Sequence, residues 1–145
     1  MEFKLFDESD LLKCAETFID VFNKEPWNDE WTLEKAKQYL FHFYQTPGFK
    51  GVLAAEGEAI IGFIFGIHRV WWRGDEFFIH EMCVMADCQK KGVGKALLHY
   101  LIEEMKESDI TNISLLTDRG IPAEEFYKKN GFEEIERLVF LSRAI

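Results

Sequence analysis

The sequence predicts an α/β (α+β) protein, with a mixed, mostly antiparallel central sheet and helices on both of its faces. Three observations predict this fold class. Apolar residues repeat at helical spacing in two segments before residue 47. Between residues 52 and 85 the period changes to two and the runs become rich in β-forming residues. Helix and strand patterns then alternate after residue 89, so the expected order is βααβββαβαβ.

The first elements are a strand and two helices. Residues 2–6 alternate in polarity and predict a strand. Residues 7–10 supply caps and early carboxylates for a helix that Pro26 ends. The apolar face of this helix consists of Leu11, Ala15, Phe18 and Phe22. Thr32 caps a second helix, which stops at Pro47. Its apolar face consists of Leu33, Ala36, Leu40 and Phe43.

A meander of antiparallel strands is expected next. Residues 52–56 and 59–70 flank Gly57, which with its neighbour forms a Gly-X pair suited to a tight hairpin turn. A second turn at residues 73–75 leads into a strand over residues 76–85. These three strands form the centre of the predicted sheet.

The second half of the chain returns to helical spacing. One apolar stripe consists of Val93, Leu97, Leu101 and Met105. Residues 112–117 predict a short strand. Pro122 fits the first turn of a helix over residues 123–130, and Gly131 fits its C-cap. Residues 133–142 predict a last strand.

Length and composition indicate one domain over residues 1–145, because 48% hydrophobic residues are enough to close a core. This much apolar surface excludes a disordered chain. The longest apolar runs, such as residues 59–67, are too short for a membrane span. The N-terminus lacks a basic region followed by an apolar stretch, so we expect no signal peptide and a cytoplasmic location.

Charge and cysteine content exclude further classes. The formal net charge of −9 argues against a nucleic-acid binder and is compatible with a cationic partner. The odd set Cys14, Cys83 and Cys88 contains no CxxC pair, so we expect neither a disulfide framework nor a zinc site. Because the four histidines do not fall at metal-ligand spacing, we expect no metal.

The most informative stretch is residues 89–96, Gln-Lys-Lys-Gly-Val-Gly-Lys-Ala, between a predicted strand and a predicted helix. Gly92 and Gly94 allow close approach of a ligand and positive φ. The helix start offers unpaired N–H groups and the positive end of the dipole. The loop is therefore an anion cradle suited to a pyrophosphate. It is not a dinucleotide fingerprint, which needs a third glycine at position 97, nor a P-loop, which needs Ser or Thr at position 96.

With this loop, the sequence resembles the GNAT superfamily, the GCN5-related N-acetyltransferases. Residues 89–94 look like the family's Gln/Arg-x-x-Gly-x-Gly/Ala loop, and residues 81–84 look like its central acyl-CoA strand. Residues 123–132 look like its A-x-x-F-Y-x-K-x-G-F segment. The three signals come in the family's order and spacing, and the resemblance covers most of the chain.

The resemblance implies that acetyl-CoA is the co-substrate. It implies a cleft where the strand ending at Val84 and the strand over residues 112–117 splay apart. A bulge would free backbone groups of the first strand for the pantetheine arm and acetyl carbonyl. The implied cofactor-binding residues are Cys83, Val84, Gln89, Lys90, Lys91, Gly92, Val93, Gly94, Lys95 and Ala96. Cys83 is expected to be a structural thiol rather than a nucleophile.

The resemblance also implies direct attack of an amine on the thioester, which needs a base for the amine proton and a donor for the leaving thiolate. Tyr127 matches the family tyrosine that serves the thiolate. Glu81 is the first choice of base and His80 the second, with a water chain as an alternative. If the strand alternates, Glu81 and His80 point to opposite faces, and one of them lines the cleft.

The acceptor side of this fold gathers aromatic and acidic residues, which suit an organic cation such as a polyamine or aminoglycoside. The expected substrate-binding residues are Trp27, Trp31, Trp71, Trp72 and Glu81. The alternative for the tryptophans is that they close the core, with the acids as a solvated rim. Residues 23–31 also look like those of aminoglycoside-acetyltransferase-like members.

Two other functions stay open at this point. One is acetylation of a protein Lys or N-terminus, which would use an open peptide groove. The other is a non-catalytic acyl-CoA-binding regulator, which Gly120 mildly favours because many family members carry Asn there. The family also often forms dimers, and residues 138–141 either pair across a homodimer interface or finish the sheet.

Overall fold

The computed structural model describes residues 1–145 and contains one five-stranded sheet in the order β1-β2-β3-β4-β5. The strands are β1 (Glu2–Leu5), β2 (Phe49–Glu56), β3 (Ala59–Arg69), β4 (Asp75–Val84) and β5 (Ile110–Leu115). The helices are α1 (Leu11–Phe22), α2 (Leu33–Tyr44), α3 (Val93–Glu104) and α4 (Pro122–Lys129). Strands β1 to β4 pair antiparallel and β4 pairs parallel with β5, so the predicted fold class is confirmed.

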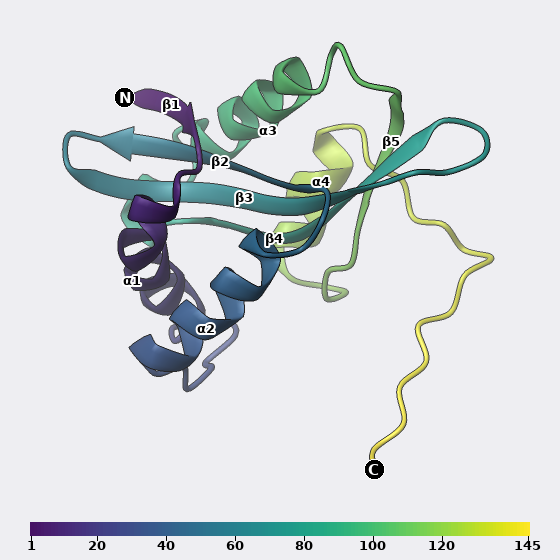
Figure 1. Ribbon diagram of the computed structural model, residues 1–145. Coiled ribbons are helices and arrows are strands. Elements are labelled where there is room, and N and C mark those ends of the chain that lie inside the picture. Colours follow the sequence, from purple (N-terminus) through teal and green to yellow (C-terminus); the bar gives the residue numbers. More distant parts are fainter.

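The sheet separates two layers of helices, with α1 and α2 below it and α3 above it in Figure 1. A cluster of 12 buried residues lies on the α3 side and a cluster of 11 lies on the α1 and α2 side. Strand β3 serves both, because it supplies Ile64 to the first cluster and Phe63 and Phe65 to the second. The sheet is therefore covered on both faces, with β3 at its centre and β4 beside it.

Local capping explains where the first two helices begin. A short 3₁₀ turn precedes α1, and the Asp7 carboxylate accepts the Ser9 N–H while Asp10 accepts the Asp7 N–H. The Thr32 hydroxyl accepts the Lys35 N–H at 3.1 Å, as its sequence position predicts. Helix α1 ends at Phe22, before the expected Pro26.

The early end of α1 has a physical cause. The Asn23 side chain both donates to the Trp31 carbonyl and accepts the Trp31 N–H, each at 2.9 Å. This reciprocal pair closes the loop between α1 and α2 and takes the place of a further helical turn.

The predicted hairpin after β2 is confirmed, with Gly57 at φ +60°.

The predicted last strand at residues 133–142 is wrong, because the structure has no strand after β5. The outer edge of β5 is unoccupied, but residues 133–142 do not pair with it. The tail instead leads away from the body of the molecule in Figure 1, and residues 138–141 are 60–83% exposed. Arg119 holds the start of this tail through Glu134 at 2.6 Å. No helix of the structure has the length and apolarity that a membrane crossing requires.

Candidate active site

An open edge on β4 defines the candidate site. Strand β4 pairs with β5 from Asp75 opposite Ile110 to Ile79 opposite Leu115, and there this pairing stops. On its other side β4 stays paired with β3 as far as Val84. Residues 80–84 therefore have one edge without a strand neighbour, which leaves backbone groups available to an extended ligand. This is the splay that the family resemblance implied, and Figure 1 shows β5 diverging from β4.

A β-bulge lies at the start of this open edge. Phe65 of β3 pairs with Glu81 and its neighbour Gly66 pairs with Ile79, so His80 has no partner on β3. The His80 ring lies 4.9 Å from the Phe43 ring of α2, and Glu81 also faces α2. The premise of strict alternation fails here, because the bulge turns His80 and Glu81 to the same face of the sheet.

Glu81 is a half-buried carboxylate in a charged and aromatic environment. Its Oε1 accepts a hydrogen bond from the Tyr39 hydroxyl at 2.5 Å. Burial is the main cause that raises the pKa of Glu81 to about 7; the Tyr39 hydrogen bond opposes this rise and the Asp29 charge adds a smaller contribution to it. Glu81 thus exchanges a proton near neutral pH, as a general base must.

His80 differs from Glu81 in its surroundings. It keeps solvent access, and its ring lies against those of Phe43 and Phe78. Partial burial, followed by the Arg69 charge, lowers the pKa of His80 below its usual value. The imidazole is therefore neutral at pH 7 and able to accept a proton.

Tyr127 lies on α4 and faces β4 through the splay. Burial raises the pKa of its hydroxyl, as do the nearby Glu81 and Cys83, so the phenol stays protonated. The rings of Phe126 and Phe132 pack on it at 5.4 and 5.5 Å. Burial also raises the pKa of Cys83 well above its usual value, which keeps that thiol un-ionised and unreactive.

The loop between β4 and α3 presents a row of free backbone donors. The N–H groups of residues 90–95 donate no hydrogen bond within the chain. Lys90 has φ +64° and Gly92 has φ +82°, a pattern of positive φ that turns successive N–H groups toward one point. The Gln89 side chain ties the loop to β4 by donating to the Val84 carbonyl at 2.8 Å. The exposed lysines of the loop are Lys90, Lys91 and Lys95.

Gly94 allows close packing on the helix side of this loop. A Cβ atom on Gly94 would lie 3.1 Å from the Phe126 ring of α4. The absence of a side chain therefore lets α4 approach the start of α3. The donors of the loop, the helix start and the open β4 edge together fit the pyrophosphate and pantetheine groups of a coenzyme A thioester.

The four tryptophans fall into two groups. Both Trp27 and Trp31 are half-buried. Trp31 packs 5.1 Å from the ring of Tyr39, the hydrogen-bond partner of Glu81, whereas Trp27 packs 4.9 Å from Phe22 of α1. Trp71 and Trp72 are 56% and 75% exposed on the β3–β4 turn. That turn precedes Asp75 at the start of β4, so about 20 Å of strand separates it from Glu81.

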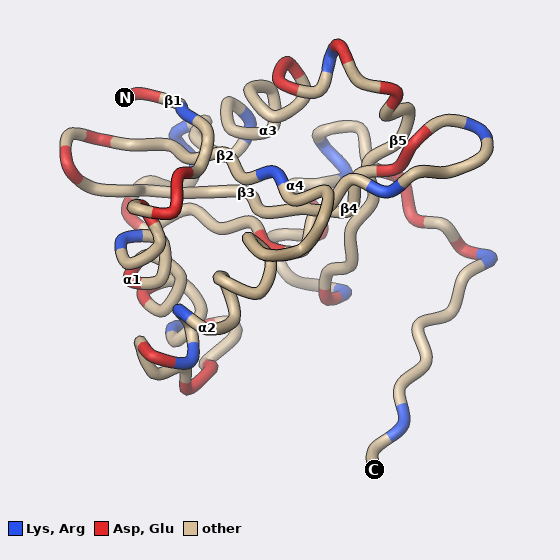
Figure 2. The backbone as a smooth tube through the Cα atoms, in the orientation of Figure 1, with Lys and Arg blue, Asp and Glu red and all other residues tan.

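Sequence reasoning missed Tyr39. The residue lies three positions after Ala36, on the helix stripe that faces the core, and this position marks it as a packing residue. Nothing in the sequence pairs it with Glu81, which lies 42 positions away. Figure 2 shows acidic positions on the loop that precedes α2, at the bottom of the view.

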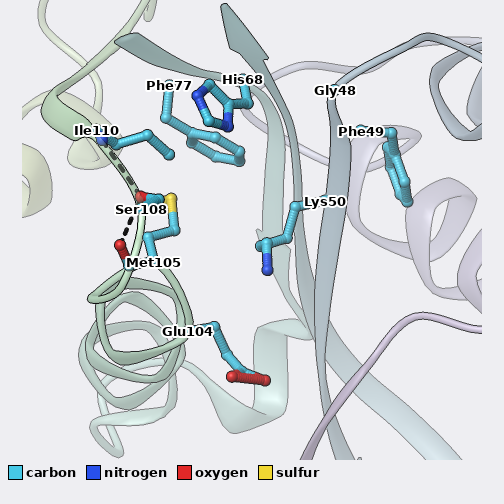
Figure 3. Close-up of a pocket in the computed structure, with 9 residues that line it drawn as sticks. All are labelled: Gly48, Phe49, Lys50, His68, Phe77, Glu104, Met105, Ser108 and Ile110. Carbon is cyan, nitrogen blue, oxygen red and sulfur yellow. Dashed lines mark hydrogen bonds between the residues drawn. The ribbon is translucent and has the colours of Figure 1, made fainter. Parts of the chain in front are cut away.

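A separate cavity of about 240 Å³ lies at the other end of α3 from the phosphate loop (Figure 3). Two of its polar residues already have partners: Ser108 Oγ donates to the Met105 carbonyl and accepts the Ile110 N–H, and His68 contacts Asp75 at 2.8 Å. The cavity takes no part in the site described above.

No group of three or more His, Cys, Asp or Glu side chains is placed to share an ion.

Comparison with known proteins gives a consistent result. The sequence profile of the Acetyltransferase (GNAT) family matches residues 11–132. A segment of 62 residues, 42% of this chain, is 44% identical to Streptothricin acetyltransferase A of Bacillus subtilis (strain 168). The matched segments span 35% and 30% of the lengths of the two curated relatives, so the chain covers about a third of each.

Solved structures show the same architecture. An aminoglycoside acetyltransferase from an uncultured soil metagenomic sample, in complex with sisomicin, is similar with a TM-score of 0.77 at 16% identity, over 99% of this chain and 95% of that one. Ribosomal-protein-alanine N-acetyltransferase from Brucella melitensis is similar with a TM-score of 0.80 at 14% identity, over 99% of both chains. At these identities the likeness shows the fold alone.

Proposed function

The chain belongs to the acetyltransferase (GNAT) family, and on that premise we propose that it transfers an acetyl group from acetyl-CoA directly to a small cationic primary amine. The observation that carries the proposal is the Glu81 carboxylate, whose pKa is raised to about 7 and which lies on the segment of β4 that has an open edge, with Tyr127 nearby. A base and a hydrogen-bond donor thus border one cleft.

The chain's own residues supply what acetyl-CoA binding needs. The N–H groups of residues 90–95 hold the pyrophosphate, and the lysines of the loop add positive charge. Backbone groups of Cys83 and Val84, on the edge without a strand neighbour, hold the pantetheine arm and acetyl carbonyl. Bound acetyl-CoA supplies the acetyl thioester, whose C–S bond breaks as the new C–N bond forms.

Glu81 accepts the proton that the acceptor nitrogen releases. At pH 7 about half of the Glu81 carboxyl groups are ionised, so base and protonated forms interconvert readily. The Tyr127 hydroxyl, which burial keeps protonated, donates to the departing sulfur. His80 is the second choice of base, because it is neutral at pH 7 and lies on the same face.

The acceptor is proposed to be a cation of the polyamine or aminoglycoside type. Asp29 and Glu81 place two carboxyl groups close enough for their charges to interact, beside the Trp31 and Tyr39 rings. The chain's net charge of −9 draws cations toward the protein. The similarity of a 62-residue segment to Streptothricin acetyltransferase A supports this class. A role for Trp71 and Trp72 in binding a larger acceptor stays a prediction, as does homodimer formation.

A reducing, cytoplasmic setting is also proposed. It is supported by the three cysteines, which are all free, with Cys14 and Cys83 buried in the core.

The test is acetyl-CoA-dependent release of free thiol against a pool of amines: polyamines, aminoglycosides, aralkylamines, amino acids and short Lys peptides. We expect polyamines or aminoglycosides to give the signal and Tyr127→Phe to lower it by 10²- to 10⁴-fold. Tyr100→Phe on α3 is the matched control and keeps full activity. Activity with Lys peptides alone would replace the proposed acceptor by a protein. No turnover from a protein that still binds acetyl-CoA would indicate a non-catalytic regulator.

A further inference from the structure

We propose that Tyr39 is a positioning residue for Glu81: its hydroxyl fixes one carboxylate oxygen so that the other faces the acceptor. This inference rests on the proposed role of Glu81 as the base. Tyr39 itself lies on α2 and contacts the reaction only through the carboxylate.

The first observation is how the Glu81 carboxylate is hydrogen-bonded. Oε1 accepts the Tyr39 hydroxyl at 2.5 Å, and this is the one hydrogen bond that the Glu81 side chain makes within the chain. A carboxylate has two equivalent oxygens, and a donor on one of them removes that equivalence. Oε2 therefore remains the oxygen available to take a proton from an acceptor amine.

The second observation is that neighbouring rings confine the Tyr39 ring. Three aromatic rings surround it, at centroid distances of 5.7 Å for Phe18, 5.1 Å for Trp31 and 4.9 Å for Phe43. They come from α1, from the loop before α2, and from α2. A ring confined in this way keeps its hydroxyl in one place, so the donor is preorganised before any substrate binds.

The same ring joins Glu81 to the acceptor loop. Trp31, which packs on Tyr39, is fixed by Asn23 through two hydrogen bonds and donates its Nε1–H to Asp29 at 3.0 Å. A movement of that loop on acceptor binding would therefore press on the Tyr39 ring. Tyr39 links the loop that meets the acceptor with the carboxylate that accepts the proton.

The hydroxyl also affects when Glu81 ionises. The ionisable groups that act on or adjoin it are Tyr39 on α2, Asp29 on the loop, Tyr127 on α4, and His80 and Cys83 on β4. Among these, the Tyr39 hydroxyl donates a hydrogen bond that favours the charged carboxylate and lowers its pKa. Removal of that hydroxyl leaves the burial and the Asp29 charge in place, so the pKa of Glu81 rises.

Tyr39→Phe tests this, with Tyr44→Phe as the matched control on the same helix. Tyr44 packs on Phe6, Phe41 and Phe49 and makes no hydrogen bond through its hydroxyl. The first measurement is carboxyl-carbon NMR titration of Glu81 in the free protein, which needs no substrate. We expect Tyr39→Phe to raise the midpoint by about one pH unit, and Tyr44→Phe to leave it unchanged.

The second measurement is the pH profile of kcat/KM. A rise of one unit from about 7 lowers the rate about fivefold at pH 7 and restores it above pH 9, because the ionised fraction recovers. A merely structural loss would lower the rate at every pH. An unchanged titration midpoint in Tyr39→Phe would overturn the inference. As a second variant, 3-fluorotyrosine at position 39 keeps the ring and donates more strongly, and is expected to lower the midpoint.

The two proposals fail separately. If Glu81→Gln keeps full activity, the base is another group and the proposed role of Glu81 is wrong, whatever the titration of Tyr39→Phe shows. If Glu81→Gln is inactive while Tyr39→Phe has the wild-type titration and pH profile, the role of Glu81 stands and that of Tyr39 is wrong.

Discussion

Glu81 is expected to destabilise the protein at the pH where it works. Its carboxyl is half-buried, and its pKa lies at about 7 instead of the usual 4.5 because burial disfavours the charged form. Glu81→Gln removes the charge and keeps the size and a carbonyl oxygen that can accept from Tyr39. We therefore expect the variant to be more stable than the wild type at alkaline pH.

The size of the effect follows from proton linkage. Below pH 4.5 the carboxyl is protonated in both the folded and the unfolded chain, so it costs nothing. Between pH 4.5 and about 7 the folded chain still holds a proton that the unfolded chain has lost, so stability falls as pH rises. Above pH 7 the cost is complete, and a rise from 4.5 to about 7 corresponds to about 3 kcal/mol.

The assay is urea denaturation of both proteins at several pH values from 5 to 8, with the free energy of unfolding of the wild type subtracted from that of Glu81→Gln. We expect this difference to grow by about 2 to 3 kcal/mol across that range. Glu124→Gln is the control that is expected to stay constant over this range. The Gly120 N–H and Lys128 lower the pKa of Glu124 below its usual 4.5, so its contribution to stability is complete from pH 5 upward and is lost only at lower pH.

Two results would refute the reasoning. A difference that stays constant from pH 5 to pH 8 would show that the pKa of Glu81 is not raised. A difference that shrinks as pH rises would show that the ionised carboxylate stabilises the fold, so that favourable contacts outweigh its burial. Neither outcome depends on knowing the acceptor, which makes this experiment independent of the substrate proposal.

Three further predictions concern the rate, the phosphate loop and the tail. The kcat/KM with any active amine falls about tenfold from pH 8 to pH 6, and a profile that is flat over this range would exclude Glu81 as the base. Gly92→Val forces a β-branched residue to φ +82°, at a cost of about 1 to 2 kcal/mol, and is expected to raise the calorimetric Kd for acetyl-CoA. The control is Gly57→Val, which carries similar strain at φ +60° in the β2–β3 turn and leaves that Kd unchanged. Deletion of residues 133–145 is expected to convert a homodimer to a monomer in sedimentation, and a monomeric wild type would contradict the predicted dimer.

Local patterns predicted most of the fold. The helices α1 and α2 follow from apolar spacing and from the caps Asp7 and Thr32, which act within a few residues of themselves. The hairpin at Gly57 follows from turn chemistry alone. The strand over residues 133–142 failed because its composition is β-forming but its pairing depends on a distant edge.

In the candidate site, too, local features were predictable from the sequence and features that depend on distant contacts were not. The glycines and free N–H groups of residues 89–96 were predictable because they are neighbours in the chain, while pyrophosphate binding by this loop stays a prediction. The position of the bulge at His80 was not, since it depends on the register between β3 and β4. Tyr39 was missed for the same reason: its bond to Glu81 joins α2 to β4, and neither residue type signals the other.

The most direct test of the proposed acetyl transfer is a crystal structure of the protein with acetyl-CoA. We expect the pyrophosphate oxygens to accept hydrogen bonds from the N–H groups of residues 90–95. We expect the thioester to lie along residues 80–84 of β4, with the Tyr127 hydroxyl at the sulfur and Glu81 facing the acetyl carbon. A pyrophosphate bound away from this loop, or a thioester out of reach of both Glu81 and Tyr127, would contradict the account.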